Sequence, residues 1–123
     1  MQVKRKYLRL EQTLSLVFER KGPTGTLRGQ GTTRNISPTG LCFIVKTPLG
    51  VGEKIAIALA LPETAHPLSF EGRIKWVHPL TAGSRPSYEV GVELSLLLGN
   101  DQNRYLLFIC DLLCRLFAEQ KRA

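Results

Sequence analysis

Two short stretches of this 123-residue chain carry the side chains best suited to binding a phosphorylated ligand. The first is a basic arm in which Arg5 and Arg9 are four residues apart, and the second is a turn that contains Asn35, Ser37 and Gly40. The planar fork of arginine matches a phosphate group and also the O6/N7 edge of guanine. Short amide and hydroxyl side chains can bond the same groups. Together these residues predict a site for a phosphate-bearing ligand.

The run Asn35-Ile36-Ser37-Pro38-Thr39-Gly40 also has the ordinary chemistry of a turn. Asn and Ser side chains bond their own backbone, Pro38 fixes φ, and Gly40 is expected to take the positive φ that other residues resist. The turn alone therefore fits a structural role as well as a binding role.

Six strand-like segments follow the arm; several show the period-two alternation of half-buried strands, and residues 41–45 are a short apolar run typical of a buried strand. The six segments cover residues 13–20, 26–36, 41–45, 53–61, 68–77 and 88–94, with turn or loop signals between them. This regular spacing predicts an antiparallel sandwich or a small barrel. The Gly- and Thr-rich segment 26–36 is a poor core strand by propensity. It suits a place where a ligand or the arm approaches the backbone closely, or an edge strand of a barrel.

The last part of the chain changes to a helical period. Asn100 or Asp101 can cap a helix whose apolar positions 106, 109, 110, 113, 116 and 117 follow a 3.6-residue repeat. Tyr105, Phe108 and Leu112 make the apolar stripe wider than one barrel mouth needs. This width predicts either deeper burial against the same barrel or a contact with a partner, including a homodimer through this C-terminal helix.

The order and spacing of these motifs resemble the PilZ domain family, which are bacterial receptors for the second messenger cyclic di-GMP. Arg5-x-x-x-Arg9 with Asn35-x-Ser37-x-x-Gly40 is similar to the two-part signature of that family. Residues 72–77 and 90–94 also resemble its pattern, so the resemblance covers nearly the whole chain. It implies a mainly β fold, a six-stranded antiparallel β-barrel of the split-barrel, PilZ-like kind with a C-terminal α-helix.

The resemblance also implies which residues bind cyclic di-GMP. They are Arg5, Arg9, Asn35, Ser37 and Gly40, with Lys4, Lys6 and Arg34 as further contributors. The family often has Asp at the position of Asn35, and an amide accepts less strongly from the guanine N–H groups, which predicts a lower affinity. The implied mechanism is a switch, in which the arm closes on the messenger and reshapes a surface that an unidentified protein partner reads.

Length and composition fit one domain, made of an arm (1–12), a barrel (13–97) and a helix (98–123) packed on or beside the barrel. The net charge is +7. Residues 1–35 carry eight Lys and Arg against two acidic residues, whereas residues 36–123 carry nine against eight. The positive charge is thus concentrated in the arm and the first strands, where it favours phosphate groups.

The cysteines Cys42, Cys110 and Cys114 have the spacing of neither a disulfide framework nor a zinc site. We expect all three to fill the core as small hydrophobic side chains in a reduced chain. The sequence also contains no apolar run of membrane-spanning length and no signal-peptide pattern. A cytoplasmic protein without membrane insertion, metal or cofactor is therefore expected, and the resemblance to the PilZ domain family implies a bacterial one.

No enzyme is expected, because the chain has no nucleophile elbow, Walker loop or zinc-binding His-Glu-x-x-His motif. Two alternatives to a receptor remain open. The first is a PilZ-like protein-interaction module that ignores the nucleotide, although the chain keeps both halves of the motif. The second is a basic barrel that binds nucleic acid nonspecifically. The strand aromatics Phe18, Phe43, Phe70 and Trp76 are assigned to the core and not to a stacking surface, so no nucleic-acid polymer is expected.

Overall fold

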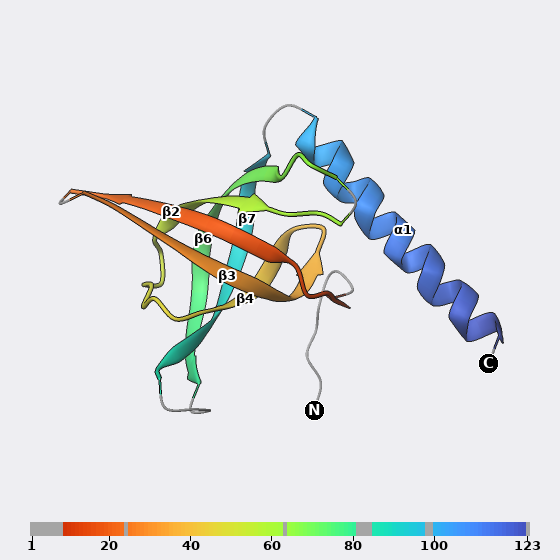
Figure 1. Cartoon of the computed structure of the whole chain (residues 1–123), viewed down its shortest axis with the longest axis horizontal. Coiled ribbons are helices and arrows are strands. Elements are labelled where there is room, and N and C mark those ends of the chain that lie inside the picture. Colours follow the sequence, from red (N-terminus) through yellow and green to blue (C-terminus); the bar gives the residue numbers. More distant parts are fainter. Residues whose placement is uncertain (1–8, 24, 63, 81–84, 98–99, 123) are drawn as a thin grey trace.

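The structure is a computed structural model that describes residues 9–23, 25–62, 64–80, 85–97 and 100–122. Its elements are β1 (Leu10–Glu11), β2 (Ser15–Gly22), β3 (Gly25–Ser37), β4 (Gly40–Val45), β5 (Lys54–Leu59), β6 (Leu68–Leu80), β7 (Ser87–Leu97) and α1 (Asp101–Arg122). Figure 1 shows the strands wrapped around one core, with α1 at one side. The predicted mainly β fold with a C-terminal helix is confirmed.

All strand pairs are antiparallel, and six of the strands close into a barrel. The order β3-β2-β5-β6-β7-β4 returns to its start because β4 also pairs with β3. The two-residue strand β1 lies outside this ring and pairs with β3. The end of the basic arm is therefore held by the barrel, and Leu10 is buried there.

The barrel core follows the period-two pattern of the sequence. In β2, Leu16 and Phe18 point inward and are 2% exposed, whereas Val17 between them is 50% exposed. The rings of Phe18 and Phe43 meet with centroids 5.9 Å apart. Burial of such side chains is the main favourable term for the fold, at about 1.5–3 kcal/mol for each one.

Two glycines inside β3, Gly29 and Gly31, are required by this core. A Cβ at Gly29 would lie 2.6 Å from Cζ of Phe18, and one at Gly31 would lie 2.8 Å from Cδ2 of Phe43. Both distances are too short for real Cβ contacts, so the two aromatic rings require glycine on β3. The strand itself lies between β2 and β4, with β1 added along part of it. The edge-strand role expected for this segment is therefore wrong, whereas the expected approach of the arm is confirmed at its end, where β1 pairs with Asn35 and Ile36.

A β-bulge in β6 overturns the expected position of Trp76. The pairing with β7 shifts between Ile74 and Trp76, so that Ile74 faces Val92 whereas Trp76 faces Gly91. Before the shift Ile74 is fully buried, and after it Trp76 is only half-buried. An extra residue in one strand moves the following side chains to the opposite face. The prediction that Trp76 belongs to the core is wrong, whereas Phe18, Phe43 and Phe70 are buried as predicted.

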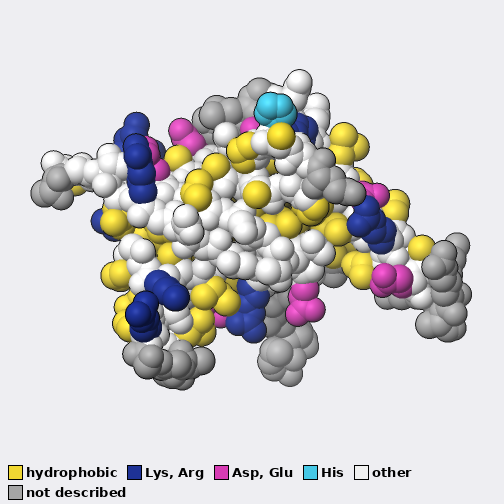
Figure 2. All heavy atoms as spheres, viewed as in Figure 1, with side chains coloured by type: hydrophobic (Ala, Val, Ile, Leu, Met, Phe, Trp, Pro, Cys, Tyr) yellow, Lys and Arg dark blue, Asp and Glu magenta, His cyan; other side chains and the backbone are white. Residues whose placement is uncertain are grey.

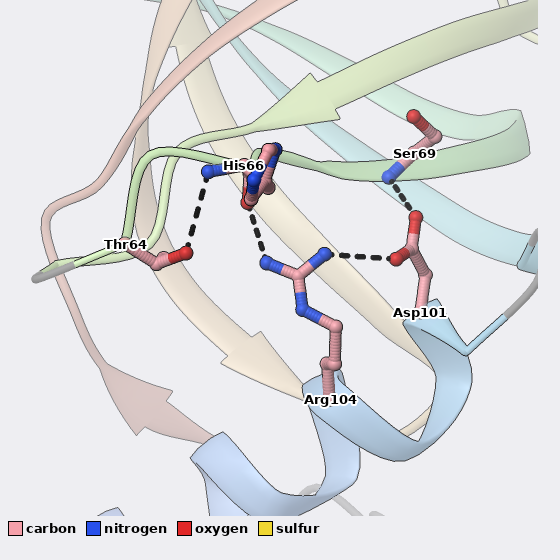
Figure 3. Close-up of polar contacts among 5 residues, drawn as sticks. All are labelled: Thr64, His66, Ser69, Asp101 and Arg104. Carbon is pink, nitrogen blue, oxygen red and sulfur yellow. Dashed lines mark hydrogen bonds and ion pairs between the residues drawn. The ribbon is translucent and has the colours of Figure 1, made fainter.

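The first turn of α1 is tied to the barrel by polar contacts (Figure 3). The backbone N–H of Ser69 donates to Oδ2 of Asp101 at 2.8 Å, and Arg104 donates to Oδ1 of the same carboxylate at 3.0 Å. Arg104 also donates to the carbonyl oxygen of His66. Asp101, expected as a helix cap, therefore anchors the helix to β6.

The side of α1 that packs on the barrel differs from the expected one. Tyr105, Ile109 and Leu112 are buried, whereas Cys110 and Cys114 are exposed. The residues expected only to widen the stripe thus make most of the contact. The prediction that all three cysteines fill the core holds for Cys42 and is wrong for the other two. Within the described residues, no helix is long and apolar enough to cross a membrane.

Candidate functional site

The turn that carries Asn35, Ser37 and Gly40 is the connection between β3 and β4. Ser37 pairs with Gly40 across the turn, and the Ser37 hydroxyl donates to the Gly40 carbonyl oxygen at 3.3 Å. Gly40 does not adopt the expected positive φ. A Cβ at this position would instead lie 2.5 Å from the carbonyl oxygen of Val92, so the close approach of β7 requires glycine here. The turn is therefore locked against β7.

Arg9 reaches this turn because β1 aligns the arm with β3. Leu10 pairs with Ile36 and Glu11 pairs with Asn35, which places the preceding residue beside the turn. Both Leu10 and Ile36 are buried, so the pairing is fixed by the core. One arginine of the first motif half and all three residues of the second are thereby brought together, although about 26 residues of chain separate Arg9 from Asn35.

These four residues line one hollow of about 230 Å³. Its walls come from β4, the bulged part of β6 and β7, as well as from the turn. The lining residues are Arg9, Asn35, Ser37, Thr39, Gly40, Leu41, Cys42, Lys75, Trp76, Gly91, Val92 and Glu93. The hollow is smaller than the ~300–1,000 Å³ typical of sites that enclose a whole small molecule. It can therefore hold one part of a ligand, with the remainder across the rim.

Trp76 is a member of the hollow that the sequence reasoning missed. Its indole lies directly on Gly91, where any Cβ would collide with the ring atoms. The ring stacks on His78 with centroids 4.6 Å apart, which holds it further in place. A half-buried indole of this kind offers a flat surface for stacking a base. The sequence indicated this region through segments 72–77 and 90–94, which resemble the family pattern. Only the bulge in β6 places the Trp76 side chain outside the barrel core.

The charged groups around the hollow are partly paired. Nζ of Lys75 lies 3.5 Å from Oε1 of Glu93, and both side chains are more than half exposed. Arg34 lies 3.6 Å from Oε1 of Glu89 and is not among the residues that line the hollow. Exposed ion pairs of this kind contribute little to stability, so Lys75 and Glu93 can separate and bond to a ligand instead. Arg34 contributes positive charge nearby.

Cys42 is the buried floor of the hollow. Its thiol donates to Oε2 of Glu89 at 3.1 Å. Burial, followed by the hydrogen bond and the charge of Glu89, raises the pKa of this thiol from 9.0 to about 12, and the charges of Arg34 and Arg9 oppose the rise. The thiol is therefore neutral at physiological pH and is a poor nucleophile.

Tyr105 connects the turn to α1. Its hydroxyl donates to the carbonyl oxygen of Ser37 at 2.6 Å and lies 3.3 Å from that of Gly40. Its ring meets Phe70 edge-on with centroids 5.0 Å apart. Burial raises the pKa of Tyr105, against the lowering effect of the hydrogen bond to Ser37, so the phenol stays protonated and remains a donor. The helix thus holds the backbone of two motif residues.

The remaining predicted site residues, Lys4, Arg5 and Lys6, lie outside the described residues. Within the described part of the chain, no group of three or more His, Cys, Asp or Glu side chains could hold a metal ion. A larger hollow of about 1,020 Å³ lies along β2 to β5, but Lys46 is the single charged residue among those that line it. The smaller hollow therefore has the better chemistry for a phosphorylated ligand.

Fold and site together define a small antiparallel β-barrel with a basic, aromatic-walled hollow at one turn. The family model of the PilZ domain matches residues 3–110. The chain therefore belongs to the PilZ domain family. No curated protein sequence matches the chain significantly.

Solved structures show the same fold at low sequence identity. The PilZ domain of YcgR from Escherichia coli, solved with c-di-GMP, is 13% identical with a TM-score of 0.69, covering 98% of this chain and 100% of that one. The c-di-GMP complex of MrkH from K. pneumonia is 20% identical with a TM-score of 0.72, covering 97% and 56%. The inhibitor of motility MotI/DgrA from Bacillus subtilis is 19% identical with a TM-score of 0.67, covering 92% and 53%. The chain thus spans about half the length of MrkH and MotI.

Proposed function

We propose that this chain is a receptor for cyclic di-GMP that binds the messenger at the hollow and regulates a protein partner. The observation that carries the proposal is the meeting of Arg9 with Asn35, Ser37 and Gly40 around one hollow that also contains Trp76. The PilZ structures of YcgR and MrkH that contain c-di-GMP support this choice of ligand. In this role the protein is a binding module and not an enzyme.

The chemistry of the hollow suits one guanine and its adjoining phosphate. The exposed guanidinium of Arg9 at the rim can pair with a phosphate or with the O6/N7 edge of the base. The indole of Trp76 can stack on the base, and the amide of Asn35 can bond its edge. Glu93, which also lines the hollow, supplies a carboxylate that can accept from the guanine N–H groups more strongly than the amide of Asn35.

The second half of the ligand would be held by the arm. In this mechanism Arg5 joins Arg9 on the phosphates, while Lys4, Lys6 and the nearby Arg34 add positive charge. Closure of the arm would pivot at Leu10, because β1 fixes the chain from that residue onward. An ordered arm then presents a new surface beside the barrel to the protein partner.

Calorimetric titration of cyclic di-GMP into wild type, Arg9→Ala and Arg28→Ala tests the proposal. Arg28 is a matched control, because it is exposed and paired with Glu19 on the β2–β3 hairpin, away from the hollow. Arg9→Ala should weaken binding by roughly 5- to 150-fold, as expected when one bidentate arginine contact of about 1–3 kcal/mol is lost. Arg28→Ala should bind like wild type.

Fluorescence adds a second readout, because Trp76 is the single tryptophan of the chain. Stacking of guanine on the indole should quench its emission with the same midpoint as the calorimetric curve. A wild type that gives neither heat nor quenching would overturn the receptor proposal and favour a ligand-independent interaction module. Equal weakening by Arg9→Ala and Arg28→Ala would show that binding follows net charge and not this site.

A further inference from the structure

The C-terminal helix exposes a second apolar stripe, which we call the outer helix face. It consists of Leu106, Leu107, Cys110, Leu113, Cys114 and Phe117. At 100° per residue these positions fall within an arc of roughly 120°. Between residues 106 and 117 the arc contains no charged side chain, whereas Asp111 and Arg115 form an ion pair elsewhere on the helix.

The barrel covers only one edge of this face, where Leu113 is partly buried against the core. Its own contact uses Tyr105, Ile109 and Leu112, and α1 lies mainly against β6. Leu107 is 69% exposed and Phe117 is 64% exposed. Figure 1 shows the C-terminal half of α1 running beyond the barrel, and Figure 2 shows hydrophobic side chains at the surface along it. Such a concentration of exposed apolar side chains on one helix marks an interaction surface.

We propose that the outer helix face pairs with the same face of a second copy of this chain, with the two helices antiparallel. Leu106, Cys110, Leu113 and Phe117 follow the spacing 4-3-4, at which apolar residues interlock with a facing helix. Antiparallel pairing about the point between residues 111 and 112 sets Leu106 opposite Phe117 of the second copy and Cys110 opposite Leu113 of the second copy. Each layer then joins two different apolar residues, so the face is complementary to itself.

Charge also favours a second copy over an acidic or nucleic-acid partner. Residues 101–122 carry four cations and three anions, so the helix is almost neutral, whereas the positive excess of the chain lies in residues 1–35. The bond from Ser69 to Asp101 attaches the barrel at the N-terminal end of α1. Antiparallel pairing therefore places the two barrels and their basic hollows at opposite ends. It also places the two helix dipoles side by side in opposite directions, which is the favourable arrangement.

The size of the face predicts a weak dimer. From Leu106 to Phe117 the stripe is about 17 Å long, at 1.5 Å for each residue. Two such faces bury on the order of 1,000 Å² in total, which lies at the lower limit of specific interfaces. Dissociation in the micromolar range is therefore expected, with the monomer dominant in dilute solution. This inference does not depend on the proposed ligand.

Sedimentation velocity over a concentration series tests the dimer with two matched variants. Phe117→Glu introduces a charge in the outer helix face, and Val51→Glu introduces the same charge at a site that is 67% exposed on the β4–β5 connection. Wild type and Val51→Glu should approach twice the monomer mass as concentration rises. Phe117→Glu should weaken association by roughly 30-fold or more, as expected when a charge replaces a large apolar side chain that packs on Leu106 of the second copy. Its circular dichroism should match wild type, because Phe117 does not belong to the core.

A cross-linking experiment tests the orientation. In a Cys114→Ser background, a chain that keeps Cys110 is mixed with a chain that carries Cys110→Ser and Leu113→Cys, so that neither chain can form a 110–113 disulfide within itself. Oxidation should then give a covalent dimer that joins position 110 of one chain to position 113 of the other. Like-to-like disulfides would indicate parallel helices and overturn the antiparallel arrangement. If wild type stays monomeric at the highest concentration, the proposed pairing with a second copy is wrong, and the outer helix face then binds a different protein. A dimer that persists in Phe117→Glu would assign it to another surface.

Discussion

The hollow and the outer helix face are both largely uncovered, but they are built in opposite ways. The hollow is small, polar and charged, and β3, β4, β6 and β7 hold its walls in place through backbone pairing. The outer helix face belongs to a single element, is apolar along about three turns, and touches the barrel only at its edge, through Leu113. The first arrangement suits directional bonds to a small ligand, whereas the second suits area-driven contact with another helix.

This difference indicates that the chain uses one region to bind a small molecule and a different region to bind a macromolecule. The two regions meet at one residue, Tyr105, whose ring is part of the helix contact and whose hydroxyl bonds the backbone of Ser37. Variants of the hollow should therefore leave association unchanged, except where they act through this tyrosine. The following three experiments test that separation.

The largest effect is expected from Gly40→Ala. The new Cβ would lie 2.5 Å from the Val92 carbonyl oxygen, so β4 and β7 must separate locally, at a cost of about 1–3 kcal/mol in the free energy of unfolding. Chemical denaturation measures this loss, and ligand binding should weaken as well. Association through α1 should stay unchanged in the folded protein.

Gly22→Ala is the matched control, since a Cβ there would meet its nearest atom, the Gly25 carbonyl oxygen, at an ordinary 3.6 Å. Its unfolding free energy should stay within about 0.5 kcal/mol of wild type. Equal stability of the two variants would contradict the tight approach of β7 to the turn.

A smaller effect is expected from Tyr105→Phe, which keeps the ring against Phe70 and removes the donor to Ser37. The loss should be about 0.5–1.5 kcal/mol in unfolding free energy. Affinity for cyclic di-GMP should fall a few-fold, because the turn loses its support, while sedimentation shows unchanged association. Tyr88→Phe is the control, since the Tyr88 hydroxyl has no hydrogen bond within the described residues. A change in association by Tyr105→Phe alone would show that the two regions are coupled.

The smallest effect concerns the thiols. At pH 8 and low protein concentration, Cys110 and Cys114 should react quickly with a thiol reagent, whereas Cys42 should react only on unfolding, as mass spectrometry can map. Because the pKa of Cys42 is raised in the folded protein, this thiol stabilises the fold at pH values below 9.0, its pKa in the unfolded chain. This contribution to the free energy of unfolding is lost as the pH rises from 9.0 towards about 12. Rapid labelling of Cys42 in the folded protein would contradict its place under the hollow.

Much of the barrel could be predicted from the sequence, because the side chains of a strand point alternately inward and outward, and this pattern can be read from a few neighbouring residues. The inward position of Phe18 followed from period two and that of Phe43 from its place in the apolar run 41–45, and both are buried. Trp76 did not follow, because its face depends on the β6–β7 register, which residues far along the chain determine. The same limit applies to Lys75 and Glu93, which line the hollow only because β6 and β7 lie beside the turn.

By itself, the sequence determined the strands, the β3–β4 turn, the helical period of the last segment and the chemistry of Arg9, Asn35 and Ser37. These properties depend on local backbone preferences and on side-chain type, which neighbouring residues already specify. The tertiary structure alone decided that Gly40 is required by the approach of β7, and that Tyr105, Ile109 and Leu112 dock while Leu107 and Phe117 stay exposed. A helix with two apolar stripes can pack by either one, and its attachments to the barrel through Asp101 and Tyr105 turn the stripe that contains Tyr105 inward.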